Sequence, residues 1–296
     1  MKKTYRTIPI LEERNKETIT YSPYHPNPKI SLFFRKLFTD FDYTNLDKDK
    51  VTNIYLSYHL LIDKKYYDII NYFTENYNVY IYMPTIIKAN YKNLILNSLD
   101  QILTTFNIKG FIVSNIADCN FLKKYAQYYE FIGNYSLNVF NNETIEQYKN
   151  LGLSRITLSR ELNQDSINKI LETTNLDTEL IVYGNLPVMA TSYCFLGKTN
   201  NCYPECGTNC KKQNTYYLKD RMDFKFRVIP DSLQTVTLIC NSKTLSISTE
   251  DIPISYVRAD IIDEDIDKIN EIINKCYNRT KFEGPDFTNG NLYKQI

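Results

Sequence analysis

Eight short apolar runs, rich in β-branched and aromatic residues, recur along the chain and are separated by longer stretches. The runs are KISLFF, NIYLS, VYIYMP, FIVSN, FIGNYSLNVF, RITLS, ELIVYG and ISYVRAD, which begin at residues 29, 53, 79, 111, 131, 155, 179 and 254. Runs of this length and composition are typical of buried β-strands. The pattern therefore predicts eight strands, each followed by a longer connecting segment.

The connecting segments have the periodicity of amphipathic helices. Two examples are LLIDKKYYDIINYFTEN and SINKILETT, the second preceded by Asn163 as a predicted N-cap. Most runs start 20 to 32 residues apart, the length of one strand-and-helix unit, and eight such units close a barrel. We therefore predict an α/β fold, a (β/α)8 TIM-barrel-like single domain over 29–296 with an N-terminal extension over 1–28. A doubly wound open sheet is the alternative that the same alternation allows.

The step between the seventh and eighth runs is different, because about 70 residues separate them instead of about 24. We predict an insertion over about 187–250 that contains a cysteine-rich loop, the segment FKFRVIP, and a hairpin formed by TVTLICNSKTLSIS at 235–248. In barrels of this kind, function collects on the loops that follow the carboxyl ends of the strands. The insertion is therefore the predicted functional region.

Composition and charge exclude several classes of protein. The chain has 35 Lys and Arg against 34 Asp and Glu, a formal net charge of +1, which excludes a polybasic nucleic-acid-binding protein. No apolar run approaches the 18 residues of a membrane span, and the first residues lack the apolar core of a signal peptide, so we expect a cytoplasmic protein. The two histidines, His25 and His59, exclude a His-rich metal site.

Four cysteines lie within 17 residues in SYCFLGKTNNCYPECGTNCKK, namely Cys194, Cys202, Cys206 and Cys210. Four thiolates can hold a tetrahedral zinc ion or an iron–sulfur cluster. Pro204 and Gly207 favour a loop rather than a helix here, and a loop can wrap around a metal centre. Reduced surface thiols or a structural zinc site are the plainer alternatives. The spacing lacks the paired C-x2-C of zinc ribbons.

The other three cysteines have different surroundings in the sequence. Cys276 shares a helical face with Ile266, Ile269 and Ile273, and Cys119 lies likewise near Ile116 and Leu122, so both are predicted core residues. Cys240 ends a predicted strand that leads back towards the barrel mouth. It is equally compatible with a metal ligand and with an alternating hairpin residue.

Several segments together carry a resemblance to a known family. They are LIVYGNLPVMATSYC, then YYLKDRMDFKFRVIPD after the cysteine loop, and also GNYSLNVFN, LGLSRITLSRELN and FTNGNLYKQI. In this order they resemble the collagenase-like peptidase family U32, in the branch common in clostridia and related anaerobes. The resemblance extends from about Lys29 to the end of the chain.

The resemblance implies a barrel-like catalytic domain with a cysteine-bound 4Fe–4S cluster. Some members of the family are named as peptidases that act on collagen, whereas others support oxygen-independent hydroxylation of RNA bases or of a quinone precursor. Cys194 matches the cysteine of the family's YC element, and Cys206 and Cys210 match the pair before YYLKDR. The fourth ligand differs from the pattern near Asp231, so either Cys202 or Cys240 must replace it. Many relatives also have an upstream domain, so the resemblance further implies a family-related partner subunit in a heterodimer.

The residues give little support to peptide cleavage, so of the activities that the resemblance implies we expect hydroxylation. The sequence has no H-E-x-x-H and no G-x-S-x-G motif, so a Ser-His or Cys-His arrangement would depend on His25 or His59. A peptidase is therefore the alternative prediction, and a non-catalytic zinc-stabilised binding subunit is a third.

Polar residues at the ends of the predicted strands are expected to line the barrel mouth. They are Arg35, Asn115, Asn138, Ser159, Glu161, Asn185, Arg258 and Asp260. Each could equally cap a loop. Arg258, Asp260 and Glu161 are the catalytic candidates, because a guanidinium suits a carboxylate-bearing donor such as prephenate.

The segment Lys211–Arg227 carries six cations against two aspartates and interleaves them with Tyr216, Tyr217, Phe224 and Phe226. Cations and aromatic rings together suit RNA phosphates and unstacked bases. A solvated basic loop is the ordinary explanation for such a run, so RNA binding is the bolder of two hypotheses for this segment.

Overall fold

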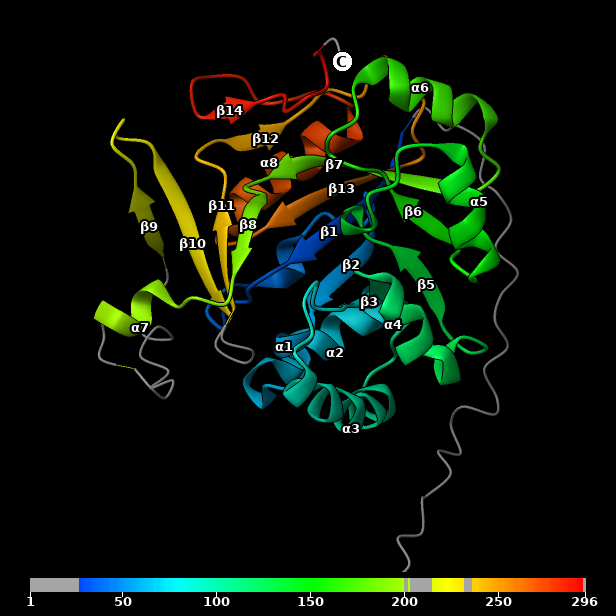
Figure 1. Cartoon of the computed structure of the whole chain (residues 1–296), viewed down its shortest axis with the longest axis vertical. Coiled ribbons are helices and arrows are strands. Elements are labelled where there is room, and N and C mark those ends of the chain that lie inside the picture. Colours follow the sequence, from blue (N-terminus) through cyan, green and yellow to red (C-terminus); the bar gives the residue numbers. More distant parts are fainter. Residues whose placement is uncertain (1–26, 200–201, 203–214, 232–235, 295–296) are drawn as a thin grey trace, which may run out of the picture.

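The computed structural model describes residues 27–199, 202, 215–231 and 236–294. Eight parallel strands close into a barrel, because β13 pairs with both β7 and β1 while the intervening strands pair in sequence order (Figure 1). The barrel strands are β1 (Lys29–Phe34), β2 (Val51–Ser57), β3 (Asn78–Tyr82), β4 (Gly110–Val113), β5 (Glu130–Gly133), β6 (Arg155–Thr157), β7 (Asp177–Gly184) and β13 (Tyr256–Ile261). All eight predicted strands form, and closure excludes the open sheet.

Helices connect the strands and cover the outside of the barrel (Figure 1). The α-helices are α1 (Tyr58–Leu61), α2 (Tyr67–Asn76), α3 (Ala89–Thr105), α4 (Ile116–Phe121), α5 (Asn142–Asn150), α6 (Gln164–Thr173), α7 (Phe195–Thr199) and α8 (Ile266–Tyr277). The described residues also form short 3-10 helices: η2 (Tyr43–Asn45), η3 (Lys64–Tyr66), η4 (Lys123–Tyr125) and η5 (Tyr135–Leu137). None of the described helices is long and apolar enough to cross a lipid bilayer.

Side-chain caps begin several of these helices. The predicted cap Asn163 accepts a hydrogen bond from the Ser166 amide and starts α6. In α4, Asn115 and Asp118 form a capping box in which each side chain accepts from the other residue's backbone amide. The predicted start of α6 is therefore confirmed.

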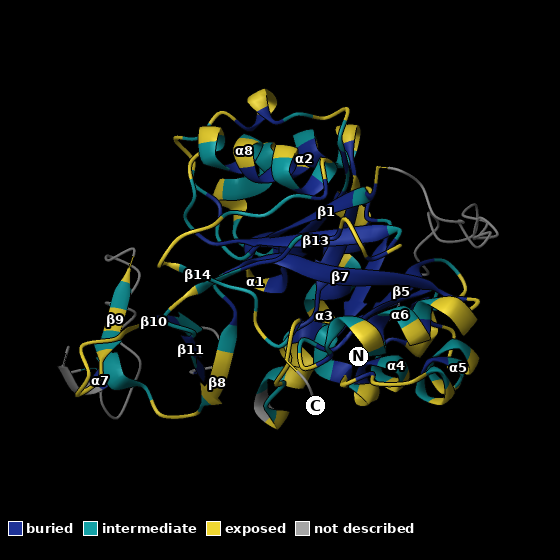
Figure 2. Cartoon of the chain, turned by 90° about the horizontal axis from the view of Figure 1, so that it is seen from above, coloured by how far each residue is buried: buried dark blue, intermediate teal, exposed yellow. Residues whose placement is uncertain are grey.

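The main apolar core lies between the barrel strands and the helices, and Figure 2 shows the strands buried beneath partly exposed helices. Cys276 is buried in it with Ile269 and Ile273 of α8, as predicted. The prediction for Cys119 is only partly right, because Cys119 is half-buried and Ile116 is 62% exposed. The short α4 turns Asp118 inward instead.

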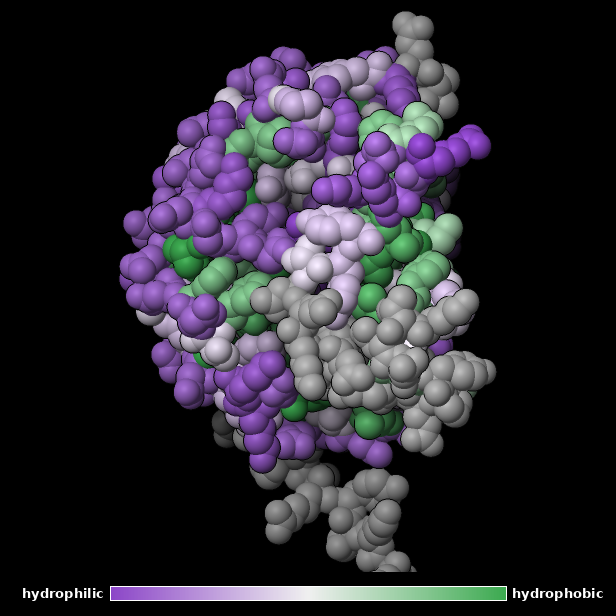
Figure 3. Space-filling view, turned by 90° about the vertical axis from the view of Figure 1, so that its left-hand side faces the viewer, coloured by the Kyte–Doolittle hydropathy of each residue, from purple (hydrophilic) through white to green (hydrophobic). Residues whose placement is uncertain are grey.

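The insertion forms a separate four-stranded antiparallel sheet in the order β8-β11-β10-β9. Its strands are β8 (Pro187–Thr191), β9 (Tyr216–Lys219), β10 (Lys225–Asp231) and β11 (Val236–Cys240). We call these four strands the inserted sheet. Apolar side chains reach the surface on the side of the molecule that carries it (Figure 3), among them Val188, Met189 and Met222, each more than half exposed.

The predicted hairpin over 235–248 does not form. β11 pairs with β8 and β10, whereas β12 (Thr244–Ser246) pairs antiparallel with β7 and parallel with β14 (Phe287–Thr288). The partners of each strand depend on long-range contacts that a local pattern does not contain.

Candidate functional site

A buried polar cluster fills the amino-terminal part of the barrel interior around Glu179 of β7. The Glu179 carboxylate accepts hydrogen bonds from Ser31 (2.7 Å), Tyr55 (2.6 Å) and Thr157 (2.9 Å). Arg155 donates to the Tyr55 hydroxyl at 3.1 Å and lies 3.9 Å from Glu179. Burial raises the pKa of the Tyr55 phenol, with the Glu179 charge as the next cause. This cluster supports the barrel below the mouth.

The catalytic candidates Arg258 and Asp260 form an ion pair in the next layer towards the mouth. Arg258 Nε and Nη2 donate to the two Asp260 carboxylate oxygens at 2.6 and 3.0 Å, and Arg258 Nη1 donates to Asn134 at 3.0 Å. Aromatic rings surround the guanidinium, with centroids 5.0 to 5.9 Å away: Phe33, Tyr55, Tyr82 and Tyr135. Arg258 is fully buried. Its geometry is that of a buried structural pair, and its role towards a substrate remains a prediction.

The third catalytic candidate, Glu161, lies elsewhere. It is exposed on the loop after β6 and accepts a hydrogen bond from Asn291 at 2.5 Å. The structure therefore does not bring Glu161 together with Arg258 and Asp260.

Most of the other strand-end residues have capping roles. Asn115 caps α4, Asn138 adopts the left-handed conformation that ends η5, and Ser159 accepts from the Glu161 amide. Asn185 donates to the carbonyl oxygen of Asn241 at 2.7 Å. Arg35 is the exception, because it lines a cavity.

The cavity lies at the carboxyl ends of β1, β2 and β3 and has a volume of about 130 Å³. The barrel contributes Arg35, Lys36, His59 and the loop 84–86, and the inserted sheet contributes the opposite wall. That wall consists of Ala190, Ile229, Pro230, Asp231, Val236 and Leu238. The sheet side of the cavity is thus apolar except for Asp231, and the barrel side carries cationic and titratable groups, an arrangement that suits a small ligand with a polar end.

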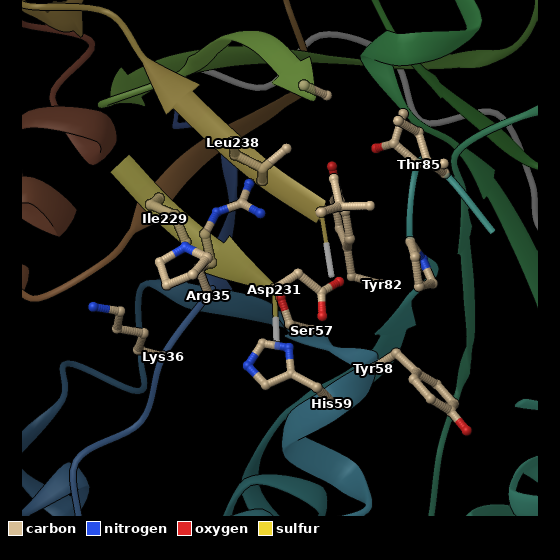
Figure 4. Close-up of a pocket in the computed structure, with 15 residues that line it drawn as sticks. Arg35, Lys36, Ser57, Tyr58, His59, Tyr82, Thr85, Ile229, Asp231 and Leu238 are labelled. Carbon is tan, nitrogen blue, oxygen red and sulfur yellow. The ribbon is translucent and has the colours of Figure 1, made fainter. Parts of the chain in front are cut away.

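Figure 4 shows His59 and Asp231 reaching into this space from opposite walls, with Ser57 close to both. His59 lines the cavity and its residue as a whole is exposed to solvent. Desolvation of the imidazole by the surrounding atoms lowers the pKa of His59 to about 4, and the Asp231 charge opposes this effect. The imidazole is neutral at pH 7 and is able to accept a proton. The sequence indicates His59 as a candidate but not Asp231 or Ser57, since no local pattern links the three residues.

Arg35 connects the cavity with the buried pair below it. Its guanidinium lies 4.8 Å from the centroid of the Phe33 ring, which also contacts Arg258 at 5.0 Å and stacks on Tyr82 at 4.0 Å. Arg35 forms no ion pair with another described residue. A ligand anion in the cavity would therefore meet a cation that is held by an aromatic ring rather than neutralised by a carboxylate.

The described part of the cysteine loop brings two cysteines close to one glycine. The Gly197 amide donates to Cys194 Sγ at 3.2 Å, and the Cys202 amide donates to the Gly197 carbonyl at 2.8 Å. A Cβ atom on Gly197 would lie 3.5 Å from Cys194 Sγ and 4.0 Å from Cys202 Cβ. Cys206 and Cys210 lie outside the described residues. Within the described residues alone, no three His, Cys, Asp or Glu side chains are grouped to hold a metal ion.

Cys240 is separated from this pair. It is fully buried with Ile229 and Ile262, and it pairs in register with Pro187 at the start of β8, whereas Cys194 follows the end of β8. At about 3.3 Å per residue, the length of β8 alone is about 13 Å. Burial also raises the pKa of the Cys240 thiol to about 11. The structure therefore brings Cys202, and not Cys240, next to Cys194.

The basic segment is partly neutralised within the described residues 215–227. Arg227 pairs with Asp263 at 2.6 Å, and Lys219 pairs with Asp223 at 2.7 Å. Tyr217, Met222 and Phe224 are exposed around them. Lys211 and Lys212 lie outside the described residues, so the hypothesis of RNA binding stays a prediction.

Two solved structures are similar to parts of this chain. A solved U32 peptidase, Mk0906, is 12% identical with a TM-score of 0.47, covering 81% of this chain and 95% of that one. Orotidine 5'-monophosphate decarboxylase from Methanocaldococcus jannaschii is 17% identical with a TM-score of 0.37, covering 52% and 78%. No curated protein matches. The model of peptidase family U32 matches residues 62–278, which is most of the barrel and the whole inserted sheet. The chain therefore belongs to peptidase family U32.

Proposed function

We propose that this chain holds a 4Fe–4S cluster on Cys194, Cys202, Cys206 and Cys210 and supports the oxygen-independent hydroxylation of an RNA base or a small aromatic precursor. The observation that carries the proposal is the approach of Cys194 and Cys202 to Gly197, in a segment whose next two cysteines follow within eight residues. Soft thiolate donors fit an iron–sulfur cluster. A hydrogen bond such as the one from the Gly197 amide to Cys194 Sγ tunes the reduction potential of such a cluster. When bound, the cluster would supply one-electron chemistry.

The residues of the chain would divide the remaining work. The cavity at the ends of β1, β2 and β3 would take the substrate, with Arg35 placed to hold an anionic group and neutral His59 placed to accept a proton. Its volume of about 130 Å³ suits a small molecule or a single extruded base better than an extended polypeptide. The inserted sheet would both carry the cysteines and exclude water from the substrate.

Metal content tests this proposal directly. The chain is purified without oxygen, and its visible absorption and its iron and acid-labile sulfide content are measured. We expect a brown protein with about four irons per chain. Cys194→Ala and Cys202→Ala should lose the absorption, whereas Cys240→Ala, the matched control, should keep it. A colourless protein with one tightly bound zinc would instead support a zinc-stabilised binding subunit.

A peptidase is the second candidate, and one observation favours it. Ser57, His59 and Asp231 line the same cavity, and these are the residue types of a serine hydrolase. However, Ser57 and His59 form no hydrogen bond with each other in the described part of the chain, and a nucleophile needs such a bond to its base. Cleavage of gelatin that survives Cys194→Ala but is abolished in both Ser57→Ala and His59→Ala would establish the peptidase instead.

A further inference from the structure

The cavity lies between two parts of the molecule rather than within one. Arg35, His59 and the loop 84–86 belong to the barrel, while Ile229, Leu238 and the other residues of the opposite wall belong to the inserted sheet. The shape and accessibility of the cavity therefore depend on how the sheet sits on the barrel.

The inserted sheet joins the barrel through a narrow neck. The chain leaves the barrel after Gly184 of β7 and returns at β12, and the two crossings are bonded to each other. The Asn185 side chain donates to the Asn241 carbonyl at 2.7 Å, and the Asn241 amide donates to the Leu186 carbonyl at 2.9 Å. Arg160, on the loop after β6, also donates to the Pro187 carbonyl oxygen at 2.8 Å, so any rotation of the sheet would be centred on this neck.

Beyond the neck, the described contacts of the sheet with the barrel include a small apolar cluster, an ion pair, and the hydrogen bond that Thr215 Oγ1 donates to Asp263 at 3.1 Å. A small apolar cluster, separate from the main core, joins Ile229, Cys240 and the half-buried Leu238 of the sheet to Ile262 of the barrel. Arg227 pairs with Asp263, which follows β13, at 2.6 Å, and this pair is only 20 to 24% exposed. Interfaces this small between parts of one chain are readily opened.

We propose that the inserted sheet is a lid that swings about the neck at 185–187 and 241–243 to open the cavity, and that the Arg227–Asp263 ion pair holds it closed. The lid does not depend on the proposed iron–sulfur cluster, because it requires only the neck, the small apolar cluster and the Arg227–Asp263 ion pair. Opening would admit substrate, and closing would bring the wall of Ile229 and Leu238 over Arg35 and His59.

Two buried cysteines allow the motion to be measured. Cys240 is fully buried in the cluster between lid and barrel, whereas Cys276 is buried in the main core beneath α8. The full-length chain is treated with N-ethylmaleimide at pH 8, and the labelling rate at each cysteine is followed by peptide mass spectrometry. Opening of the lid would expose Cys240 but not Cys276, so we expect Cys240 to react faster than Cys276.

Breaking the ion pair should promote opening selectively. Arg227→Met and Asp263→Asn should each raise the labelling rate of Cys240 by about two- to fivefold, the range expected for a partly exposed pair, and leave Cys276 unchanged. Lys219→Met is the matched control, because it breaks the Lys219–Asp223 pair within the sheet. Equal rates at the two cysteines, equal acceleration of both by Arg227→Met, or no difference between Arg227→Met and Lys219→Met would each overturn the lid.

Discussion

Arg258 and Asp260, two residues apart on β13, point the same way into the barrel and form a bidentate ion pair that is almost completely buried. Successive residues of a strand face opposite sides, so a spacing of two places both side chains in the interior. Burial alone would lower the pKa of the Arg258 guanidinium, but the charge of Asp260 raises it above its usual value.

Removing one member of this pair should be more harmful than removing both. Asp260→Asn leaves a buried guanidinium without a counter-charge and should lower the free energy of unfolding by about 3–5 kcal/mol. The double variant Arg258→Met with Asp260→Asn should recover part of that loss. Urea unfolding of the three proteins measures both effects, and a loss below about 1 kcal/mol for Asp260→Asn would contradict the buried geometry.

The Tyr55 hydroxyl should contribute measurably to stability. Tyr55→Phe removes one of three hydroxyl donors to Glu179 and an acceptor for Arg155. Because both charged groups stay buried, the expected loss is about 1–3 kcal/mol of unfolding free energy. Tyr293→Phe is the control, since Tyr293 is 57% exposed and its change should stay within about 0.5 kcal/mol. Equal unfolding midpoints for the two variants would refute this interpretation.

Asp118 should make stability depend on pH between about 4 and 6. Burial raises the pKa of Asp118 to about 6, against the hydrogen bonds that it accepts from the amides of Ser114 and Asn115. A raised carboxyl pKa favours the protonated folded state, so this stabilisation is present below pH 4 and is lost as the pH rises through 6. The difference of about two pKa units corresponds to about 3 kcal/mol. Asp118→Asn should remove this part of the pH dependence, measured as urea midpoints at pH 4.5, 5.5 and 7; curves that stay parallel would argue against it.

His59 should remain neutral throughout the physiological range. With its pKa lowered to about 4, its imidazole signals in a proton NMR spectrum should not shift between pH 5.5 and 8. Because the pKa of His59 is lower in the folded state, His59 makes its full contribution to the free energy of unfolding above pH 6.5, and this contribution is lost as the pH falls towards 4. His25 supplies the second histidine signal, and His59→Gln assigns the two. A titration midpoint of the His59 signals between pH 6 and 7 would contradict the lowered pKa.

The barrel was predictable from the sequence because its signals are local. The strand runs, their spacing and the cap at Asn163 each depend on neighbouring residues, and all of them are found in the structure. The partners of β11 and β12 were not predictable, because they depend on contacts with β8 and β7 across the fold. The position of Asp231 opposite His59 has the same cause. The buried role of Glu179 was predictable in principle, since a carboxylate within the apolar run ELIVYG indicates an inward-facing charge that needs partners.

Closure of the barrel does not depend on the inserted sheet, because β7 pairs directly with β13. The Leu186 carbonyl and the Asn241 amide lie 2.9 Å apart, so a turn of a few residues could span the gap between them. Evolution could therefore lengthen, exchange or shed this segment without rebuilding the scaffold. The barrel can therefore stay constant while the inserted segment changes, and new chemistry can arise in that segment at its own rate.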